Sequence, residues 1–400
     1  MFLDGVGMRT IGVVTGGRAD YSIYLPLLRA VQSDPELNLE LYVTGTHLAP
    51  GFGSTVRCIE ADGFTISARI DSLDASNRPE GISRSIAKGV LGFAELFERQ
   101  RPDILLVLGD RFEMLAAVVA ALPFTIPVAH IAGGELSFGS LDDCIRHAIT
   151  KMSHLHFATA EPYRQRLIQM GEEPWRVTTT GSPSLDNLKF MKYQSREKLE
   201  REFDLVLEPA PLIVTFHPET LEPEETVAHA RELLAALGGV ERPILITAPN
   251  ADAGGEDIRC EMERFAHANP RTRLVENMGT QLFFSVLRVA ACMVGNSSSG
   301  IAEAASFELP VVNLGNRQSG RIMGSHIIQS ACERNAIGAA IVRALDPAFR
   351  RALKGLKNPY GDGEATPRIV QVLKTTELGR KLVMKRFHDL RTSQHQVGRG

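Results

Sequence analysis

The chain has few cysteines and no long apolar run, and each scarcity excludes a class of protein. Its 400 residues include only five cysteines, which never form a C-x-x-C pair. This argues against a disulfide framework and a structural zinc site, and it favours a reducing compartment. No apolar run approaches the roughly 18 residues that a membrane-spanning helix needs. The first residues, MFLDGVGMRT, lack the basic start and apolar core of a signal peptide. We therefore expect a cytoplasmic protein.

The chain also lacks an excess of charge of either sign. Lysine and arginine total 44 and aspartate and glutamate 47, which leaves a formal net charge of -3. No basic field indicates nucleic acid or an anionic membrane as a partner. The apolar fraction of 44% and the charged fraction of 23% are ordinary for a globular protein. A chain of this length predicts two to three domains of about 100–200 residues each.

Short apolar runs alternate with helix-length stretches through most of the chain. Runs such as DILLVLGD and IPVAHIAGG end in glycine or aspartate, as buried parallel strands do where they open into loops. A second series of such runs begins near residue 211 with PLIVTFHP. The pattern predicts an α/β fold with two Rossmann-like domains facing across a cleft. We expect the N-terminal domain over residues 1–182, the C-terminal domain over 183–378, and a frayed helix and tail over 379–400.

Polar residues directly after the predicted strands of the first domain are the candidates for chemistry. In TGGRADY, the glycines let the backbone approach a ligand, free helix N–H groups can face an anion, and Arg18 adds positive charge. An ordinary turn with a surface arginine explains the same residues. Asp110 follows a buried strand, where it can act chemically or simply cap the next helix. Glu135, Asp142 and Asp143 follow the next strand, and so many carboxylates exceed what capping requires.

The second domain offers a histidine and a serine-rich loop at the corresponding places. His217 follows the first strand, where a core or capping role is the simpler alternative. Residues 295–300, GNSSSG, lie between a strand and a helix and are followed by Glu303, so hydroxyl and helix N–H groups can cradle a phosphate. The loop is not a P-loop, because the lysine is missing. The histidines of RHAITKMSHLHF lack zinc-site spacing, and we expect no metal.

In this order and number, the motifs resemble those of the hydrolysing UDP-N-acetylglucosamine 2-epimerases of sialic-acid and legionaminic-acid biosynthesis. The resemblance spans roughly residues 9–378. It includes TGGRADYSIYLPLL, TGTHLAPGFG, GDRFEMLAA, HIAGGELSFGSLDDCIRHAITKMSHLHF, HPET, PNADAGG, GNSSSGIAEAASF, NLGNRQSGR and YGDGEATPRI. The fold of that family is of the two-domain glycosyltransferase-B type, which agrees with the architecture predicted above.

The resemblance implies a reaction on a nucleotide-sugar that needs no cofactor. UDP-N-acetylglucosamine would lose its C2 proton and its UDP, and water would add to the glucal intermediate to give N-acetylmannosamine. The acid/base groups would be Asp110, Glu135, Asp142 and Asp143, with His217 facing them from the other domain. The substrate-binding residues would be Arg18, His47, Arg111, Asn250, Ser297, Ser298, Glu303, Arg317 and Arg321. We also expect a homo-oligomer, either a dimer or a tetramer.

The chain departs from its relatives at two positions, and rival functions remain. Ala132 stands where the non-hydrolysing relatives and the animal enzyme have a glutamate, so Glu135 is expected to take over part of that work. Ile23 stands where they have a lysine, which leaves Arg18 to bind phosphate alone. The alternatives are the same reaction on a UDP- or GDP-linked 2,4-diacetamido-2,4,6-trideoxyhexose, a glycosyltransferase of the same fold, and a non-catalytic sugar-nucleotide sensor.

Overall fold

The chain forms two compact α/β units. The computed structural model describes residues 8–49, 55–74, 76, 79–138, 141–219, 223–249, 254–276 and 278–390. The first unit comprises Met1–Glu135, Cys144–Pro183 and Glu364–Gly400, and the second comprises Leu136–Asp143 and Ser184–Gly363. Each unit is built on one parallel sheet, so the predicted α/β class with two Rossmann-type sheets is confirmed.

The first unit contains a seven-stranded sheet in the order β3-β2-β1-β4-β5-β6-β7, and every neighbouring pair is parallel. Its strands are β1 (Arg9–Thr15), β2 (Leu37–Thr44), β3 (Ile66–Ile70), β4 (Ile104–Leu108), β5 (Val128–Ile131), β6 (Leu155–Ala158) and β7 (Val177–Thr179). Its helices are α1 (Arg18–Ser33), α2 (Val56–Ala61), α3 (Pro79–Arg99), α4 (Phe112–Ala121), α5 (Asp142–Met152), α6 (Glu161–Gln169), α15 (Ala365–Thr375) and α16 (Arg380–Val383).

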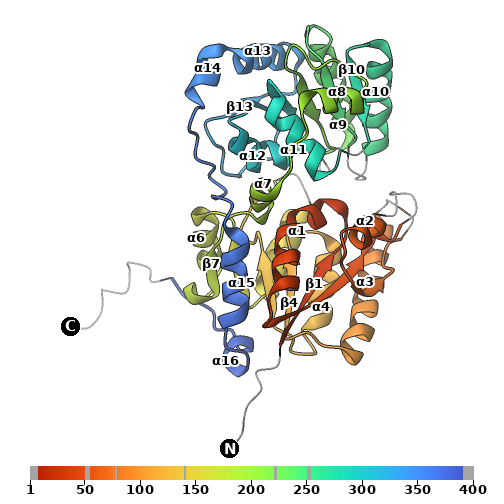
Figure 1. Cartoon of the computed structure of the whole chain (residues 1–400). Coiled ribbons are helices and arrows are strands. Elements are labelled where there is room, and N and C mark those ends of the chain that lie inside the picture. Colours follow the sequence, from red (N-terminus) through yellow and green to blue (C-terminus); the bar gives the residue numbers. More distant parts are fainter. Residues whose placement is uncertain are drawn as a thin grey trace, which may run out of the picture. The chain divides into compact units, whose positions relative to one another are not determined.

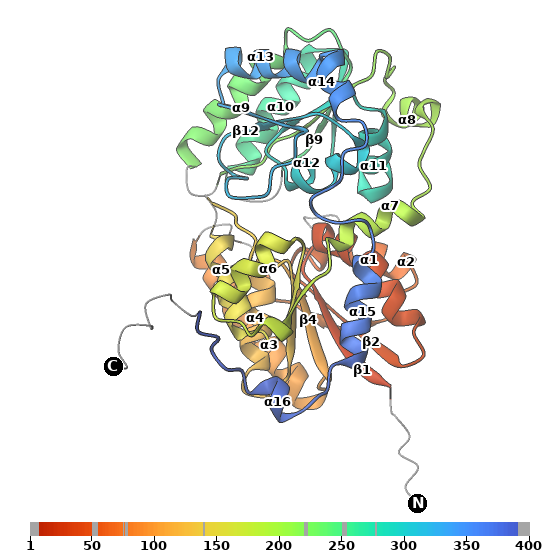
Figure 2. The same ribbon diagram turned by 90° about the vertical axis from the view of Figure 1, so that its left-hand side faces the viewer.

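Helices cover both faces of this sheet because its strands are apolar on both sides. Along β4, Ile104 and Leu106 pack in one cluster with α1 and α15, whereas Leu105 and Val107 pack in the other with α3 and α4. This is the alternation that a strand buried on both faces requires. Figures 1 and 2 both show α15 alongside α1, although more than 300 residues separate the two helices in sequence.

The second unit contains a six-stranded parallel sheet in the order β10-β9-β8-β11-β12-β13. Its strands are β8 (Leu212–Thr215), β9 (Ile244–Thr247), β10 (Thr272–Val275), β11 (Cys292–Gly295), β12 (Val311–Leu314) and β13 (Ile327–Ser330). Its helices are α7 (Asn187–Phe190), α8 (Arg196–Phe203), α9 (Pro223–Leu237), α10 (Gly255–Ala268), α11 (Gly279–Val289), α12 (Ser298–Ala302), α13 (Arg334–Leu345) and α14 (Pro347–Ala352).

The strand order fixes where each sheet can hold a ligand. In both units the order reverses beside the first strand, between β1 and β4 in the first sheet and between β8 and β11 in the second. Ligands of open parallel sheets bind at such switch points, beyond the carboxyl ends of the strands. The glycine turn that precedes Arg18 follows β1, and Asp110 follows β4. In the second unit, His217 follows β8 and the segment 296–300 follows β11.

The C-terminal region is organised differently from the expectation. The sequence pattern placed residues up to 378 in the second domain, but α15 packs in the core of the first unit, where Ile369 and Leu373 are fully buried. The helix follows the segment that leaves the second unit at Gly363. Short-range sequence patterns cannot detect this return, because it depends on contacts with strands and helices at the other end of the chain.

Residues 379–390 also make specific contacts with the first unit, where a frayed tail was expected. Leu382 is buried, and the buried Arg176 donates hydrogen bonds to its carbonyl oxygen and to that of Lys381. Lys385 reaches the fully buried carboxylate of Glu172 at 2.6 Å. None of the helices in the described part of the chain combines the length and apolarity needed to span a bilayer.

Candidate active site

Asp110 is held in a defined position at the carboxyl end of β4. It follows Gly109, whose φ of 74° lies in the left-handed region that glycine favours. The Nε2 atom of His130 on β5 lies 2.7 Å from the Gly109 carbonyl oxygen, and a carbonyl only accepts, so Nε2 carries the proton. Burial lowers the pKa of His130 to about 3, so the ring is neutral and its Nδ1 accepts from Thr150. The histidine therefore orients the turn that presents Asp110.

The carboxylate of Asp110 forms an ion pair with Arg146, a residue that the sequence analysis did not assign. Arg146 lies on α5, and its side chain is only 3% exposed. It also donates to the carbonyl oxygen of Ala132 at 2.9 Å. Ala132 has a φ of 61°, which is unusual for a residue with a Cβ atom. An arginine four residues after Asp142 on a helix was the available signal, since that spacing keeps both on one face.

Glu135 lies after β5 in the same unit and is almost completely buried. Its Oε1 atom accepts a hydrogen bond of 2.6 Å from the hydroxyl of Thr159, which follows β6. The preceding residue is also fixed, because Arg166 of α6 donates to the carbonyl oxygen of Gly134. The carboxylates of Asp110 and Glu135 thus follow two neighbouring strands of one sheet. This matches the predicted placement at the carboxyl edge.

Asp142 and Asp143 begin α5 and have a more structural setting. The Oδ1 atom of Asp143 accepts from the backbone N–H of Ser137 at 2.7 Å, which ties the loop before the helix. Within the second unit, Arg321 donates to the carbonyl oxygen of Leu136 at 3.2 Å. Acidic residues in a first helical turn also interact favourably with the helix dipole. These contacts give Asp143 a structural role that does not require catalysis. Its catalytic role stays a prediction.

The glycine turn after β1 is organised by a carboxylate of its own. Asp20 accepts from the backbone N–H groups of Gly16 and Gly17, each at 2.8 Å, so these two groups are already hydrogen-bonded within the turn. Arg18 begins α1 and is partly buried. Desolvation raises the pKa of Asp20, and the two backbone hydrogen bonds oppose that shift.

His47 has no ring nitrogen left to offer a ligand. Its Nε2 lies 2.9 Å from the hydroxyl of Thr15, and its Nδ1 lies 2.7 Å from that of Thr55. The residue is fully buried, and burial lowers its pKa to about 4. The ring therefore stays neutral and links β1 to the loop after β2. A contact with substrate through this side chain, as the resemblance implied, is not what its surroundings indicate.

Arg111 is the part-exposed cation of the loop after β4. Its Nε lies 3.6 Å from Oε2 of Glu113, and its guanidinium carbon lies 5.2 Å from the centre of the Phe112 ring. Burial raises the pKa of Glu113, and Arg111 opposes that shift. The stacked and ion-paired geometry gives the guanidinium a fixed orientation at the switch point.

In the second unit, the serine-rich segment surrounds a buried glutamate. Ser297 caps α12 by accepting from the N–H of Ser299, and Ser298 is the first residue of that short helix. Glu303 follows the helix and is buried. Burial raises the pKa of Glu303 to about 6, while hydrogen bonds from Ser184 and Ser299 act in the opposite direction. A carboxyl group in this state can accept from ribose hydroxyls.

His217 and Arg317 come together through Asn296 at the other side of the same switch point. Asn296 exchanges two hydrogen bonds with the backbone of His217, and its own carbonyl oxygen lies 3.3 Å from Nη1 of Arg317. Burial first, and Arg317 second, lower the pKa of His217 to about 3, so the imidazole is neutral. A neutral imidazole beside an arginine can donate a hydrogen bond from one ring nitrogen and accept one at the other without itself carrying a charge.

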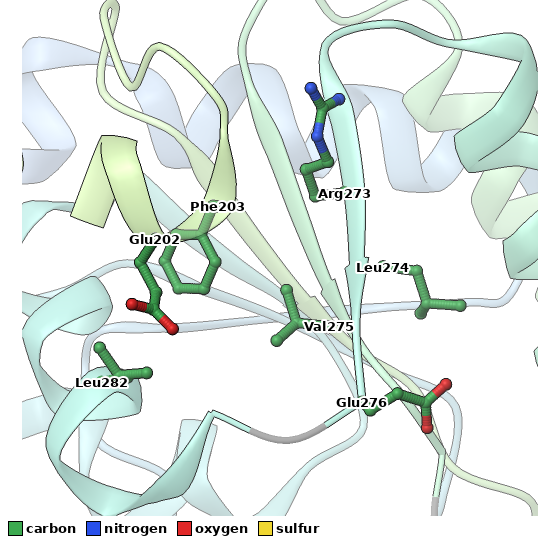
Figure 3. Close-up of a pocket in the computed structure, with 7 residues that line it drawn as sticks. All are labelled: Glu202, Phe203, Arg273, Leu274, Val275, Glu276 and Leu282. Carbon is green, nitrogen blue, oxygen red and sulfur yellow. The ribbon is translucent and has the colours of Figure 1, made fainter. Parts of the chain in front are cut away.

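Three further features of the chain concern candidate sites. Asn250, expected to line the substrate pocket, lies outside the described residues. A surface hollow of about 330 Å³ is present in the second unit (Figure 3), and it is lined by Glu202, Phe203, Arg273, Leu274, Val275, Glu276 and Leu282. None of these seven belongs to the predicted site. Among the described residues, no cluster of histidine, cysteine and acidic side chains has the geometry of a metal site.

Comparison with known proteins shows which family the chain belongs to. The family model described as UDP-N-acetylglucosamine 2-epimerase matches residues 29–374. The chain belongs to this family. A hydrolysing GDP/UDP-N,N'-diacetylbacillosamine 2-epimerase of Campylobacter jejuni is 36% identical over 86% of the chain and 87% of its own length. A hydrolysing UDP-N,N'-diacetylbacillosamine 2-epimerase of Legionella pneumophila is 35% identical over 94% and 99%. A UDP-N-acetylglucosamine 2-epimerase of Neisseria meningitidis is 33% identical over 96% and 100%.

Solved structures of 2-epimerases share the fold. The crystal structure of a Neisseria meningitidis UDP-N-acetylglucosamine 2-epimerase bound to UDP-N-acetylglucosamine has a TM-score of 0.81 to this chain. It is 18% identical and covers 92% of this chain and all of its own. The resemblance to a 2-epimerase family, stated from the motifs, is therefore confirmed, as is the fold class.

Proposed function

We propose that this 2-epimerase family member hydrolyses a nucleotide-linked 2-acetamido sugar and inverts C2. The proposed substrate is UDP-N-acetylglucosamine, and the products are N-acetylmannosamine and UDP. The observation that carries the proposal is the set of side chains that follows neighbouring strands in each sheet. The first unit places Asp110 and Arg111 after β4 and Glu135 after β5, and the second places a histidine after β8, serines after β11 and an arginine after β12. Carboxylates suit proton transfer at carbon, and the cationic, dipolar set suits a diphosphate leaving group.

In the proposed reaction, a carboxylate removes the proton from C2 while the bond between C1 and the UDP oxygen breaks. This gives a 2-acetamidoglucal and free UDP. Water then adds across the double bond, with its hydroxyl at C1 and a proton at C2 on the opposite face. The ion pair with Arg146 orients the Asp110 carboxylate, and the Thr159 hydroxyl orients Glu135. Both carboxylates are therefore proposed as acid/base groups, with Asp142, Asp143 and the neutral His217 as further candidates.

The nucleotide is proposed to bind mainly through the second unit. Ser297, Ser298, Arg317 and Arg321 would hold the diphosphate, and Glu303 would accept from the ribose. Arg18 and Arg111 of the first unit remain proposed as substrate-binding residues. We retain Asn250 in the proposed substrate pocket. The proposal that His47 contacts substrate becomes one of support for the loop after β2, since both ring nitrogens are already bonded.

A second substrate is supported by the relatives. The proteins at 36% and 35% identity are described as acting on N,N'-diacetylbacillosamine nucleotides, whereas the relative at 33% is described as a UDP-N-acetylglucosamine 2-epimerase. The second candidate is therefore the same reaction on a 2,4-diacetamido-2,4,6-trideoxyhexose linked to UDP or GDP.

The test is an NMR assay of the purified chain with a panel of sugar nucleotides and no acceptor. UDP or GDP release with a 2-epimeric free sugar is the expected result, and the nucleotide used fastest identifies the substrate. Nucleotide release only when an acceptor is added would indicate a glycosyltransferase. Tight binding without turnover on every member would indicate a sensor. The proposal further includes a cytoplasmic location and a dimer or tetramer, which light scattering would test.

A further inference from the structure

Asn296 occupies an unusual position at the switch point of the second unit. It directly follows β11, whose last residue, Gly295, pairs with Thr215 of β8. Gly295 has a φ of 137°, and a Cβ atom on it would lie 1.9 Å from the Thr215 carbonyl oxygen, so only glycine fits there. This close approach brings Asn296 against the end of β8, where its N–H donates to the Thr215 carbonyl oxygen at 3.1 Å.

The side chain of Asn296 hydrogen-bonds to both backbone groups of His217. The Asn296 Oδ1 accepts from the His217 N–H at 2.7 Å, and the Asn296 Nδ2 donates to the His217 carbonyl oxygen at 2.8 Å. His217 lies beyond the last residue of β8, and it precedes Pro218, which disfavours a helical conformation at this position. His217 is therefore part of neither the strand nor a helix, and the Asn296 side chain satisfies the hydrogen-bonding requirement of its backbone. The Asn296 amide thus extends the hydrogen bonding between β8 and β11 beyond the ends of the two strands.

The main chain of Asn296 contacts the loop after β12, which contains Arg317 and Gln318. Its carbonyl oxygen accepts from Nε2 of Gln318 at 2.9 Å and from Nη1 of Arg317 at 3.3 Å. Asn296 itself is fully buried, and its polar groups are all engaged within the second unit. The side chain therefore hydrogen-bonds to the backbone of His217, and the backbone carbonyl oxygen accepts from the side chains of Arg317 and Gln318.

We propose that Asn296 is a positioning residue for the epimerase reaction, whose side-chain amide sets the location of His217 relative to the sugar. The inference rests on the proposed function, in which His217 acts on the reacting sugar. Because a displacement of about 1 Å in a reacting group can lower a rate 10²-fold, loss of the amide lowers kcat by about 10²-fold. The carbonyl oxygen of residue 296 remains in any variant, so the affinity for UDP changes less than about 3-fold.

The main test compares Asn296→Ala with a matched control, Asn313→Ala. Asn313 lies on β12 in the same sheet, is equally buried, and donates to Gln329 at 2.8 Å. We expect the Asn313 variant to keep kcat within about 2-fold while losing thermal stability similarly. Asn296→Asp keeps the volume and the acceptor but turns an oxygen toward the His217 carbonyl. It should therefore fold and also lose kcat, even where the alanine variant does not fold.

A double-mutant cycle with His217→Ala separates positioning from an independent role. If Asn296 acts through His217, the double variant has the kcat of His217→Ala alone. Losses that multiply fully, or a native kcat in both Asn296 variants, would overturn the inference. A native kcat in His217→Ala would also overturn the inference, because it would show that His217 does not act on the reacting sugar.

A measurement without turnover keeps the inference distinct from the proposed function. In the NMR spectrum of the full chain, the imidazole signal that disappears in His217→Ala should shift in Asn296→Ala and stay in place in Asn313→Ala. An unchanged signal in Asn296→Ala would refute the positioning role. Failure of the native chain to release UDP or GDP from any sugar nucleotide would contradict the proposed function instead, and this spectral comparison would still decide on Asn296.

Discussion

Replacement of Arg146 by methionine should expose how strongly the Asp110 carboxylate depends on its partner. Methionine keeps much of the length of the side chain but removes the charge. The Arg146 side chain is 3% exposed and that of Asp110 is 19% exposed, so the pair is largely shielded from water. Breaking a buried pair by removing one partner costs about 3–5 kcal/mol. The partial exposure of Asp110 favours the lower end, so we expect about 3 kcal/mol lower free energy of unfolding.

The second step of this prediction is a double variant with Asp110→Asn. Removing the unpaired carboxylate from the Arg146→Met background should restore about 2 kcal/mol, because residues in direct contact show coupling of about 0.5–3 kcal/mol. Asp110→Asn alone should lower kcat by about 10²-fold or more. Arg69→Met is the control, since Arg69 pairs with Glu60 on the surface and such pairs contribute at most about 1 kcal/mol.

The chain provides its own reporter for this experiment. Its single tryptophan, Trp175, belongs to the first unit, so its fluorescence during urea denaturation follows the unit that contains the pair. The coupling energy comes from the four unfolding curves of the native chain, the two single variants and the double variant. Additive effects, with no recovery in the double variant, would refute the argument that Arg146 compensates the Asp110 charge.

Three further predictions test other parts of the molecule. Glu135→Gln should lower kcat by about 10²-fold while UDP still binds, and loss of UDP affinity at unchanged kcat would show a positioning role instead. Ser298→Ala and Arg317→Ala should each weaken UDP binding in calorimetry by about 1.5–3 kcal/mol, and native affinity in both would place the nucleotide elsewhere. Burial acts to raise the pKa of Glu172, but hydrogen bonds from His156, Lys151 and Lys385 outweigh burial and lower it to about 2 from 4.5, so the stability of the first unit should fall as pH drops from about 5 toward 2. Glu172→Gln should lose that part of the slope, and an unchanged slope would contradict the assignment.

The sequence predicted the parts of the fold that depend on short-range pattern. Buried parallel strands appear as continuous apolar runs, and the residue after each run lies at the carboxyl edge of a sheet. For this reason Asp110, Glu135 and His217 were found at the ends of β4, β5 and β8. The return of α15 to the first unit was not predicted, because nothing in its local pattern distinguishes contact with α1 from contact with the second sheet.

The supporting residues were harder to detect than the groups they support. Arg146 and Asn296 act through partners 36 and 79 residues away in sequence, and only the folded chain brings those partners together. His47 shows the opposite case, since the resemblance implied that it lines the substrate pocket. In the fold, its ring bridges Thr15 and Thr55 in the interior. The position of a residue in the sequence predicts that it lies at the edge of the sheet. Only its hydrogen-bond partners in the fold show whether its side chain is available to a ligand or supports the structure.

Exchange with solvent at C2 is the most direct test of the proposed reaction. Elimination must break the C2–H bond, and the proton added later comes from water or from an exchanging side chain. Turnover of UDP-N-acetylglucosamine in D₂O should therefore give N-acetylmannosamine with deuterium at C2, detected by NMR and mass spectrometry. The other substrates of the panel should behave in the same way at their own C2. Simple glycosidic hydrolysis would give N-acetylglucosamine with C2 untouched. A 2-epimeric product that keeps its original C2 hydrogen in D₂O would contradict the elimination mechanism.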